Sequence, residues 1–111
     1  MLFRSAKYAA LFGFGNRTGI DLPGEEAGLT IGEKMTVIDA ACNSFGQNIN
    51  VNMVQMAAAF SSLVNGGNYY QPHIVKRIEK STGEVVKTIE PNLVRQTVTS
   101  EIGRASCRER V

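Results

Sequence analysis

Residues 52–67 read NMVQMAAAFSSLVNGG, the segment with the strongest structural signal in the chain. Asn52 is a good helix N-cap, and Gln55 stands three residues later, where it completes a capping box. Asn65, Gly66 and Gly67 are typical of a helix end. The pattern predicts a helix over residues 53–64. Because this helix is apolar on almost every side, we expect it to be buried in a domain larger than this chain.

The residues before this helix predict one further helix and a long turn-rich stretch. Residues 2–11 place small and apolar side chains on one helical face, and Gly13 supplies a stop. Glycines and a proline punctuate residues 13–32, with a short extended piece at 20–22. The N-terminal third is therefore expected to be one helix followed by irregular backbone.

The residues after the helix predict strands. Residues 73–79 and 84–90 are two strand-like runs around a turn at 80–83, which indicates a hairpin. A third extended piece is expected at 93–98, and Thr99 to Glu101 are typical of the start of another helix. With the helices this gives an α+β fold class.

The C-terminal residues 102–111 are expected to be foreign to the protein. They can be encoded by the sequence of a common sequencing-library adaptor, which would also interrupt the helix that begins just before them. The chain has 12 basic and 10 acidic side chains, and this tail holds Arg104, Arg108 and Arg110 against Glu109. The remaining residues carry no excess charge, so nothing indicates binding to nucleic acid.

Few residues suggest metal or cofactor chemistry. Without Cys107 of the tail, Cys42 is the sole cysteine, and its small neighbours predict a buried apolar side chain. His73 is the sole histidine and is expected at the surface or at a strand edge. No cofactor and no metal site is predicted. No leader peptide is predicted, and the longest mainly apolar run, 53–64, is too short to cross a bilayer.

Three segments, taken together, carry a family resemblance. They are FGFGNRTGIDLPGE at 12–25, NSFGQNINVNMVQMAAAFSSLVNGG at 43–67 and PHIVKRI at 72–78. In this order and spacing, the chain resembles the transpeptidase domain of penicillin-binding proteins from about Leu2 to Glu101. The look of the first two segments favours a monofunctional class B member. The resemblance implies a partial domain over residues 1–101, with helices around one buried helix and a short antiparallel hairpin.

One departure from the family's pattern lies at the start of the central helix. The family usually writes Thr-Pro before the glutamine, whereas this chain has Asn52-Met53-Val54-Gln55. The substitution keeps a capping side chain and loses the fixed φ of proline. We expect the helix to form all the same.

The three motifs that perform acyl transfer in that family are missing from this chain. No serine is followed three residues later by lysine, and no asparagine has a serine two residues before it. For the Lys-Thr/Ser-Gly motif there are two imperfect matches, Asn16-Arg17-Thr18-Gly19 and Lys80-Ser81-Thr82-Gly83. The first lacks the lysine and the second has one residue too many. No catalytic residue is therefore expected in the chain, and the fragment alone is expected to be inactive.

One segment, residues 44–47, is expected to contact a substrate because of the family resemblance. The residues Ser44, Phe45, Gly46 and Gln47 resemble the family's Ser-Phe-Gly-Gln loop, which borders the substrate groove. Glycine lets backbone approach a ligand, and a glutamine amide can both donate to and accept from a peptide. The alternative is structural, with Phe45 filling a core and Gln47 satisfying local backbone.

The resemblance implies a cell-wall enzyme. Such a D,D-transpeptidase cross-links peptidoglycan stem peptides through a serine acyl-enzyme, and β-lactams trap the same serine. Its parent protein is expected to be membrane-anchored, on the extracytoplasmic face of the bacterial cell membrane, and to work in cell-wall synthesis complexes. The alternative is a β-lactam-sensing or degenerate, non-catalytic penicillin-binding module. The residues that would separate the two lie outside the sequence.

Overall fold

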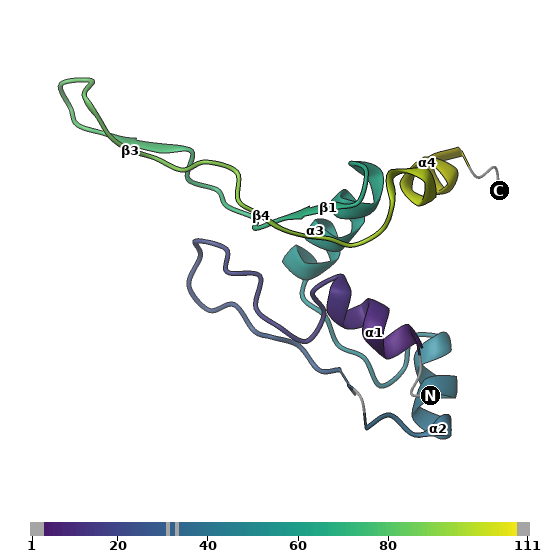
Figure 1. The fold of residues 1–111 in the computed structure, drawn as a ribbon. Coiled ribbons are helices and arrows are strands. Elements are labelled where there is room, and N and C mark those ends of the chain that lie inside the picture. Colours follow the sequence, from purple (N-terminus) through teal and green to yellow (C-terminus); the bar gives the residue numbers. More distant parts are fainter. Residues whose placement is uncertain (1–3, 31, 33, 109–111) are drawn as a thin grey trace.

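The computed structural model describes residues 4–30, 32 and 34–108, which form an elongated body measuring 60 × 33 × 25 Å. Its elements in chain order are α1 (Arg4–Leu11), α2 (Val37–Ser44), α3 (Met53–Val64), β1 (Asn68–Tyr70), β2 (Arg77–Glu79), β3 (Val85–Thr88), β4 (Leu93–Gln96) and α4 (Ser100–Arg108). The helices gather at one end, and the β2–β3 hairpin projects from the other (Figure 1). The mixture of helices and antiparallel strands confirms the α+β class.

Helix α3 begins and ends where the sequence predicts. The Asn52 side chain accepts a hydrogen bond from the Gln55 backbone N–H at 2.7 Å, and the Gln55 side chain accepts one from the Asn52 N–H at 2.9 Å. These two bonds are the reciprocal pair of a capping box, so two backbone donors of the first turn are satisfied. The capping chemistry therefore survives without the family's proline.

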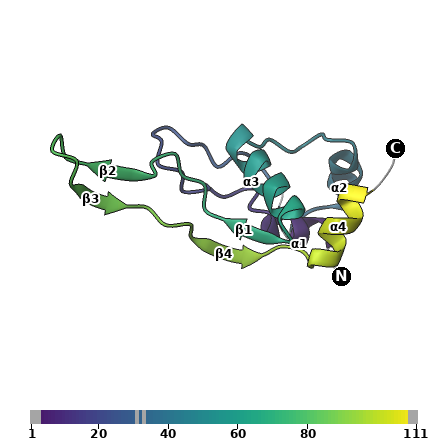
Figure 2. The same ribbon diagram turned by 90° about the horizontal axis from the view of Figure 1, so that it is seen from above.

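The sides of α3 differ in burial. Gln55, Ala59 and Ser62 are buried against the rest of the chain. Met53 is 89% exposed and Phe60 is 64% exposed. Figure 2 shows α3 between the β1–β4 pair and the turn-rich segment. An enclosing larger domain stays a prediction, and the exposed apolar side chains are what such a domain would cover.

Two separate antiparallel pairs make up the strands. β2 pairs with β3 as the predicted hairpin, with Ile78 opposite Lys87, although each strand is shorter than its predicted run. β4 lies within the extended piece predicted at 93–98, and it pairs with β1, where Tyr69 faces Arg95. β1 was not predicted because its three residues directly follow the turn that ends α3, so no alternating pattern can develop.

A small core joins α3 to the β1–β4 pair. Tyr69 is 2% exposed, and the Ser62 and Thr97 hydroxyl oxygens lie 3.1 Å apart in the interior. The Thr97 hydroxyl also donates to the Gly67 carbonyl at 3.2 Å. At Gly67, φ is +90° and an added Cβ would lie 1.8 Å from the Val98 carbonyl oxygen, so only glycine fits there.

Helix α2 is the helix that the sequence patterns did not indicate. It has its own capping box, in which Thr36 accepts from the Asp39 N–H and Asp39 accepts from the Thr36 N–H. The helix is only eight residues long, and none of them is buried against the rest of the described chain. For the same reason the prediction of a buried Cys42 is wrong, because that side chain is only partly covered on α2.

The first and last helices compare differently with their predicted bounds. α1 covers Arg4–Leu11 of the predicted 2–11, and Leu2 lies outside the described residues. α4 begins at Ser100 as predicted and continues to Arg108, past the proposed boundary at 101. Gly103 of α4 packs so closely on α3 that a Cβ there would lie 2.4 Å from the Leu63 carbonyl oxygen. No helix among the described residues is long and apolar enough to span a bilayer.

Candidate functional site

The loop Ser44–Gln47 leaves α2 through a Schellman motif. The Gln47 N–H donates to the Cys42 carbonyl at 3.0 Å, and the Gly46 N–H donates to the Asn43 carbonyl at 3.1 Å. Gly46 has φ +87°, the left-handed geometry that this helix ending needs, and a Cβ there would meet no atom within 4 Å. Within the described chain, the glycine is therefore required by the turn and not by a close neighbour.

The side chains of this loop point into open space. Phe45 is 66% exposed, and Gln47 is also exposed. The Ser44 hydroxyl donates to the Ala41 carbonyl at 2.7 Å, which holds it on its own helix. Among the described residues, the Gln47 side chain makes no hydrogen bond to protein. Phe45 therefore fills no core within the described chain, and the structural alternative, with Phe45 in a core of the complete domain, stays open.

The far end of this loop is fixed to the turn-rich segment. Asn48 takes a left-handed φ of 59°, and Asn50 then forms an isolated two-bond bridge with Leu29. The Leu29 N–H donates to the Asn50 carbonyl at 2.7 Å, and the Asn50 N–H donates back at 2.9 Å. Gly28 permits this approach, since a Cβ there would lie 2.2 Å from the Asn50 carbonyl oxygen.

The first imperfect motif match, Asn16-Arg17-Thr18-Gly19, serves the structure of the turn-rich segment. The Glu25 carboxylate accepts hydrogen bonds from the N–H groups of Thr18 and Gly19 and from the Thr18 hydroxyl. Partial burial raises the pKa of Glu25, but these hydrogen bonds outweigh it and lower the pKa overall. The Thr18 hydroxyl is therefore already occupied.

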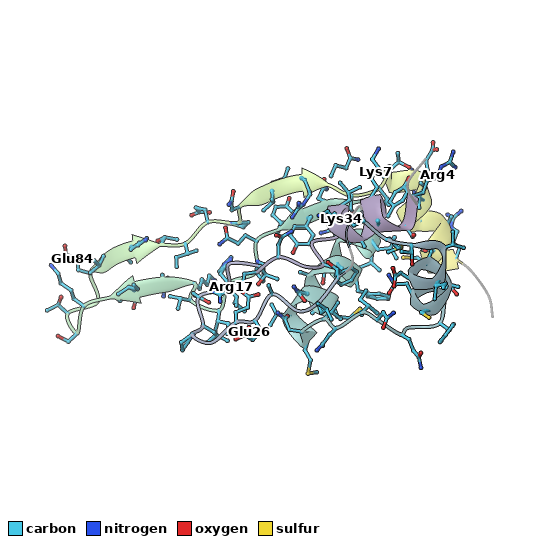
Figure 3. The ribbon with its side chains drawn as sticks, turned by 90° about the horizontal axis from the view of Figure 1, so that it is seen from below. Arg4, Lys7, Arg17, Glu26, Lys34 and Glu84 are labelled. Carbon is cyan, nitrogen blue, oxygen red and sulfur yellow. The ribbon has the colours of Figure 1, made fainter. Side chains whose placement is uncertain are left out.

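The second imperfect match, Lys80-Ser81-Thr82-Gly83, lies in the turn of the β2–β3 hairpin. The Lys80 ammonium pairs with Glu84 at 2.8 Å, and both side chains are exposed. Figure 3 places Glu84 at the tip of the hairpin, whereas Arg17 and Glu26 mark the turn-rich segment nearer the helices. The structure does not bring the two imperfect matches together.

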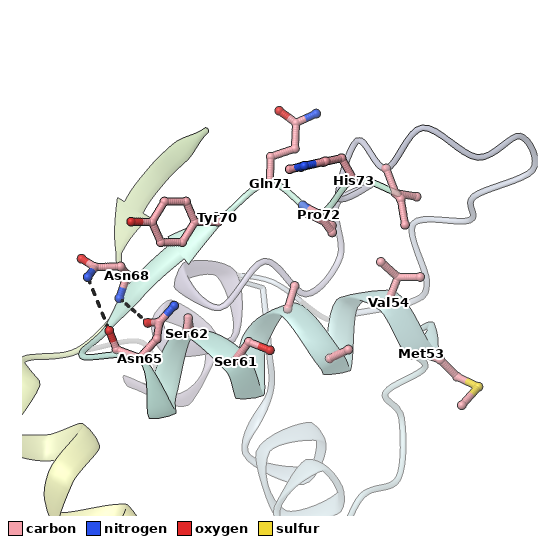
Figure 4. Close-up of a pocket in the computed structure, with 13 residues that line it drawn as sticks. Met53, Val54, Ser61, Ser62, Asn65, Asn68, Tyr70, Gln71, Pro72 and His73 are labelled. Atoms are coloured by element: carbon pink, nitrogen blue, oxygen red, sulfur yellow. Dashed lines mark hydrogen bonds between the residues drawn. The ribbon is translucent and has the colours of Figure 1, made fainter. Parts of the chain in front are cut away.

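A groove of about 620 Å³ runs along α3 toward the segment after β1 (Figure 4). Its walls are mostly apolar, with amide and hydroxyl groups at the β1 end, and they comprise Ile20, Met53, Val54, Ala57, Ala58, Ser61, Ser62, Asn65, Asn68, Tyr70, Gln71, Pro72 and His73. His73 is exposed, as predicted. No lysine lines the groove within the described part of the chain, so the groove offers no serine–lysine pair for acyl transfer.

One carboxylate ties the turn-rich segment to the base of the hairpin. Asp21 accepts hydrogen bonds from the N–H groups of Ile74 and Val75, each at 2.9 Å. These bonds from Val75 and Ile74 lower the pKa of Asp21, because they favour its charged form. Among residues 4–30, 32 and 34–108, no group of three His, Cys, Asp or Glu side chains could hold a metal ion.

Comparison with known proteins agrees with this architecture. Residues 4–104 match the sequence profile described as the penicillin binding protein transpeptidase domain. The chain belongs to this family. It is 39% identical over 100 residues to stage V sporulation protein D of Bacillus subtilis, and the match covers 88% of this chain and 16% of that protein. Penicillin-binding protein H of the same organism is 33% identical, with 90% of the chain and 15% of the relative covered.

Solved structures show the same fold. Penicillin binding protein 3 of Mycobacterium tuberculosis in its apo form superposes with a TM-score of 0.81 at 26% identity, over 91% of this chain and 23% of that one. Its complex with ampicillin gives a TM-score of 0.80 at 26% identity, covering 91% and 22% of the two chains. The chain thus spans about a sixth to a quarter of the proteins that it matches.

The structure adds anchors that sequence patterns did not reveal. The Leu29–Asn50 bridge, the Glu25 carboxylate and the Asp21 carboxylate all join segments that are distant or irregular. The bridge joins two backbone segments, and the two carboxylates accept from backbone N–H groups; neither role has a periodic signature. The only local signal is the run of glycines and acids in residues 13–28, which indicates turns without naming their partners.

Proposed function

We propose that this chain is the central part of a D,D-transpeptidase that cross-links peptidoglycan stem peptides. In that reaction, a serine oxygen outside this chain attacks the carbonyl of a D-alanyl-D-alanine bond, and the terminal D-alanine leaves with a proton. An amine of a neighbouring strand then attacks the acyl-enzyme ester and frees the serine. Membership of the transpeptidase family supports this proposal. So does one relative, penicillin binding protein 3, which was crystallised with aztreonam and with ampicillin, compounds that would bind at the same serine.

The part of this chain that we assign to the substrate cleft is Ser44, Phe45, Gly46 and Gln47. The observation that carries the assignment is a capped loop with an exposed aromatic ring and a glutamine amide that makes no hydrogen bond to the described part of the chain. Such a loop can pack on a peptide and hydrogen-bond its backbone without rearranging. The parent protein is proposed to be anchored at the extracytoplasmic face of the cell membrane and to work with other cell-wall proteins.

The complete gene provides the test of the enzymatic role. A Ser-x-Asn motif is expected within about one helix length before Leu2, with Ser-x-x-Lys further upstream. A Lys-Thr-Gly strand is expected after α4. The purified parent should be acylated at the Ser-x-x-Lys serine by a labelled penicillin. An intact gene without Ser-x-x-Lys would refute the enzyme and favour the sensing or degenerate module.

The chain alone is proposed to be inactive. With no Ser-x-x-Lys, none of its serines has a same-face amine to take the hydroxyl proton. Intact-mass spectrometry after incubation with a penicillin should show the unmodified chain. Stoichiometric labelling of a serine would contradict this.

We further propose that the native domain part ends at residue 101 and that 102–111 derive from an adaptor. The adaptor sequence that can encode this tail supports the boundary, whereas α4 itself continues to Arg108. The sequence of an independent clone across the junction should show a different, helix-forming sequence in place of residues 102–111. Recovery of the same ten residues would reject the idea.

A further inference from the structure

We propose that Gln55 is a positioning residue that holds the Ser44–Gln47 loop in place through a buried set of hydrogen bonds to the turn-rich segment. The inference rests on the proposed function, because it assigns the loop to the substrate cleft. Gln55 itself touches no substrate. It acts by fixing the backbone that follows the loop against the turn-rich segment.

The Gln55 side chain is fully buried, at 0% exposure, and its amide makes three hydrogen bonds. Nε2 donates to the Asn16 carbonyl at 2.7 Å and to the Ala27 carbonyl at 2.8 Å, which lie 39 and 28 residues away in sequence. Oε1 accepts from the Asn52 N–H at 2.9 Å. The amide therefore uses both donor hydrogens and an acceptor site at once.

These bonds act on the loop by a short route. Asn52, bonded to Gln55, also donates from its side chain to the Glu26 carbonyl at 2.7 Å. Asn50, two residues before Asn52, is bridged to Leu29. Leu29 in turn lies two residues after Ala27, whose carbonyl accepts from Gln55. The backbone from Asn50 to Asn52 is thus clamped against residues 26–29. Gln47 lies three residues before that clamp, so the clamp fixes where the loop ends.

Other side chains of similar size cannot replace this amide. A carboxylate offers no donor to the Asn16 and Ala27 carbonyls and would face two acceptor oxygens in a buried place. A protonated carboxyl regains one of the two donations. Leucine fills the volume but leaves both carbonyls and the Asn52 N–H without this partner. These differences give the residue a pH signature that a packing role alone would lack.

The test uses the full-length parent protein and compares wild type, Gln55→Glu and Gln55→Leu. The second-order rate constant for acylation by a labelled penicillin is measured from pH 5 to pH 8. Each variant's rate constant is divided by the wild-type value at the same pH. For Gln55→Glu we expect a loss of about tenfold at pH 8, recovering to within about twofold at pH 5 as the carboxyl is protonated. For Gln55→Leu we expect a loss of similar size that does not depend on pH.

The matched control is Gln96→Glu, the same chemical change at an exposed position of β4, which should follow wild type throughout. A ratio for Gln55→Glu that stays flat with pH, whether impaired or not, overturns the proposal. Should Gln55→Glu fail to fold at pH 8, Asn52→Asp decides. It keeps the cap oxygen and loses the donations of the Asn52 amide to the Glu26 carbonyl and the Glu25 carboxylate. Faster hydrogen exchange at Gln47 and Asn50 then supports the clamp, and unchanged exchange refutes it.

Hydrogen exchange also separates this proposal from the proposed function. If wild-type parent takes up no penicillin, the enzymatic assignment fails. Hydrogen exchange at the loop amides can still be compared between wild type and Gln55→Glu at each pH. This comparison reports whether Gln55 holds the loop. If wild type is acylated and Gln55→Glu matches it at every pH, only the positioning role fails.

Discussion

The described part of the turn-rich segment, residues 13–30, and the β2–β3 hairpin are ordered by different interactions. The segment has almost no regular structure, yet Gln55, Asn52 and Gln71 side chains donate to its carbonyls and its own Asp21 reaches the hairpin base. The hairpin is regular, but every residue of its two strands is exposed. Side chain to backbone bonds therefore order an irregular segment, whereas a two-stranded ladder alone gives little stability.

The largest expected effect compares the same substitution in the two regions. Gly28→Ala in the segment should lower the free energy of unfolding of the parent protein by roughly 3 kcal/mol or more, because left-handed strain adds to a steric overlap. Here φ is +73°, and the new Cβ would lie 2.2 Å from the Asn50 carbonyl oxygen. Gly83→Ala in the hairpin turn, with φ +86° and no atom within 4 Å, should cost only about 1 kcal/mol. Urea unfolding measures both.

Equal losses for the two alanine variants would mean that backbone strain alone matters. The close approach of Gly28 to Asn50 would then contribute nothing, and the clamp between the segment and the loop would be looser than the structure shows. The comparison is informative because both glycines share a positive φ and differ in their surroundings.

A smaller effect is expected at Glu25, and it depends on pH. Glu25→Gln keeps one acceptor oxygen, so it should lose about 1 kcal/mol of stability at pH 7. The folded pKa of Glu25 lies below its ordinary value of 4.5. Its contribution is therefore present above pH 4.5 and is lost as the pH falls through the folded pKa. Wild type and variant should differ in chemical denaturation at pH 7 and converge in acid.

The hairpin supplies the control for that experiment. Glu84→Gln removes the charge from an exposed acid paired with Lys80 and should leave the pH dependence nearly unchanged. A difference between wild type and Glu25→Gln that persists at low pH would show that the variant disturbs packing and not the carboxylate's hydrogen bonds.

Sequence reasoning succeeded where a signal is local and failed where it is not. The capping box of Asn52 and Gln55 and the hairpin turn at 80–83 are local, and both were predicted correctly. The second role of Gln55, donation to Asn16 and Ala27, depends on residues 39 and 28 positions away and leaves no trace in spacing. Helix α2 is an exception, because its Thr36–Asp39 capping box is also a local signal, yet this helix of eight residues was missed.

The candidate loop itself illustrates the same division. Ser44 to Gln47 were selected by family resemblance, and their contact with a substrate stays a prediction. What the structure adds is a different reason for Gly46, whose φ of +87° completes the end of α2. A glycine that suggests close approach of a ligand when only the sequence is known can instead be required by the left-handed backbone of a helix end.

A local effect is expected where the two regions meet. Asp21→Asn leaves one carboxamide oxygen for the two N–H groups that Asp21 now holds, those of Ile74 and Val75. At least one of these amides should exchange with solvent faster, while amides of α3 stay protected. Hydrogen exchange followed by NMR resolves the single sites. Unchanged exchange at both would mean that the hairpin base is held by its own ladder.

The smallest effect is expected at the hairpin tip, with Lys80→Gln. The Lys80–Glu84 pair is exposed on both sides, so its loss should change stability by less than about 0.5 kcal/mol, and by still less in high salt. Urea unfolding at low and high ionic strength tests this. A larger, salt-independent loss would mean that another part of the parent protein covers the tip. The hairpin would then be held by contacts with residues outside this chain, whereas the turn-rich segment is held by side chains of the chain itself.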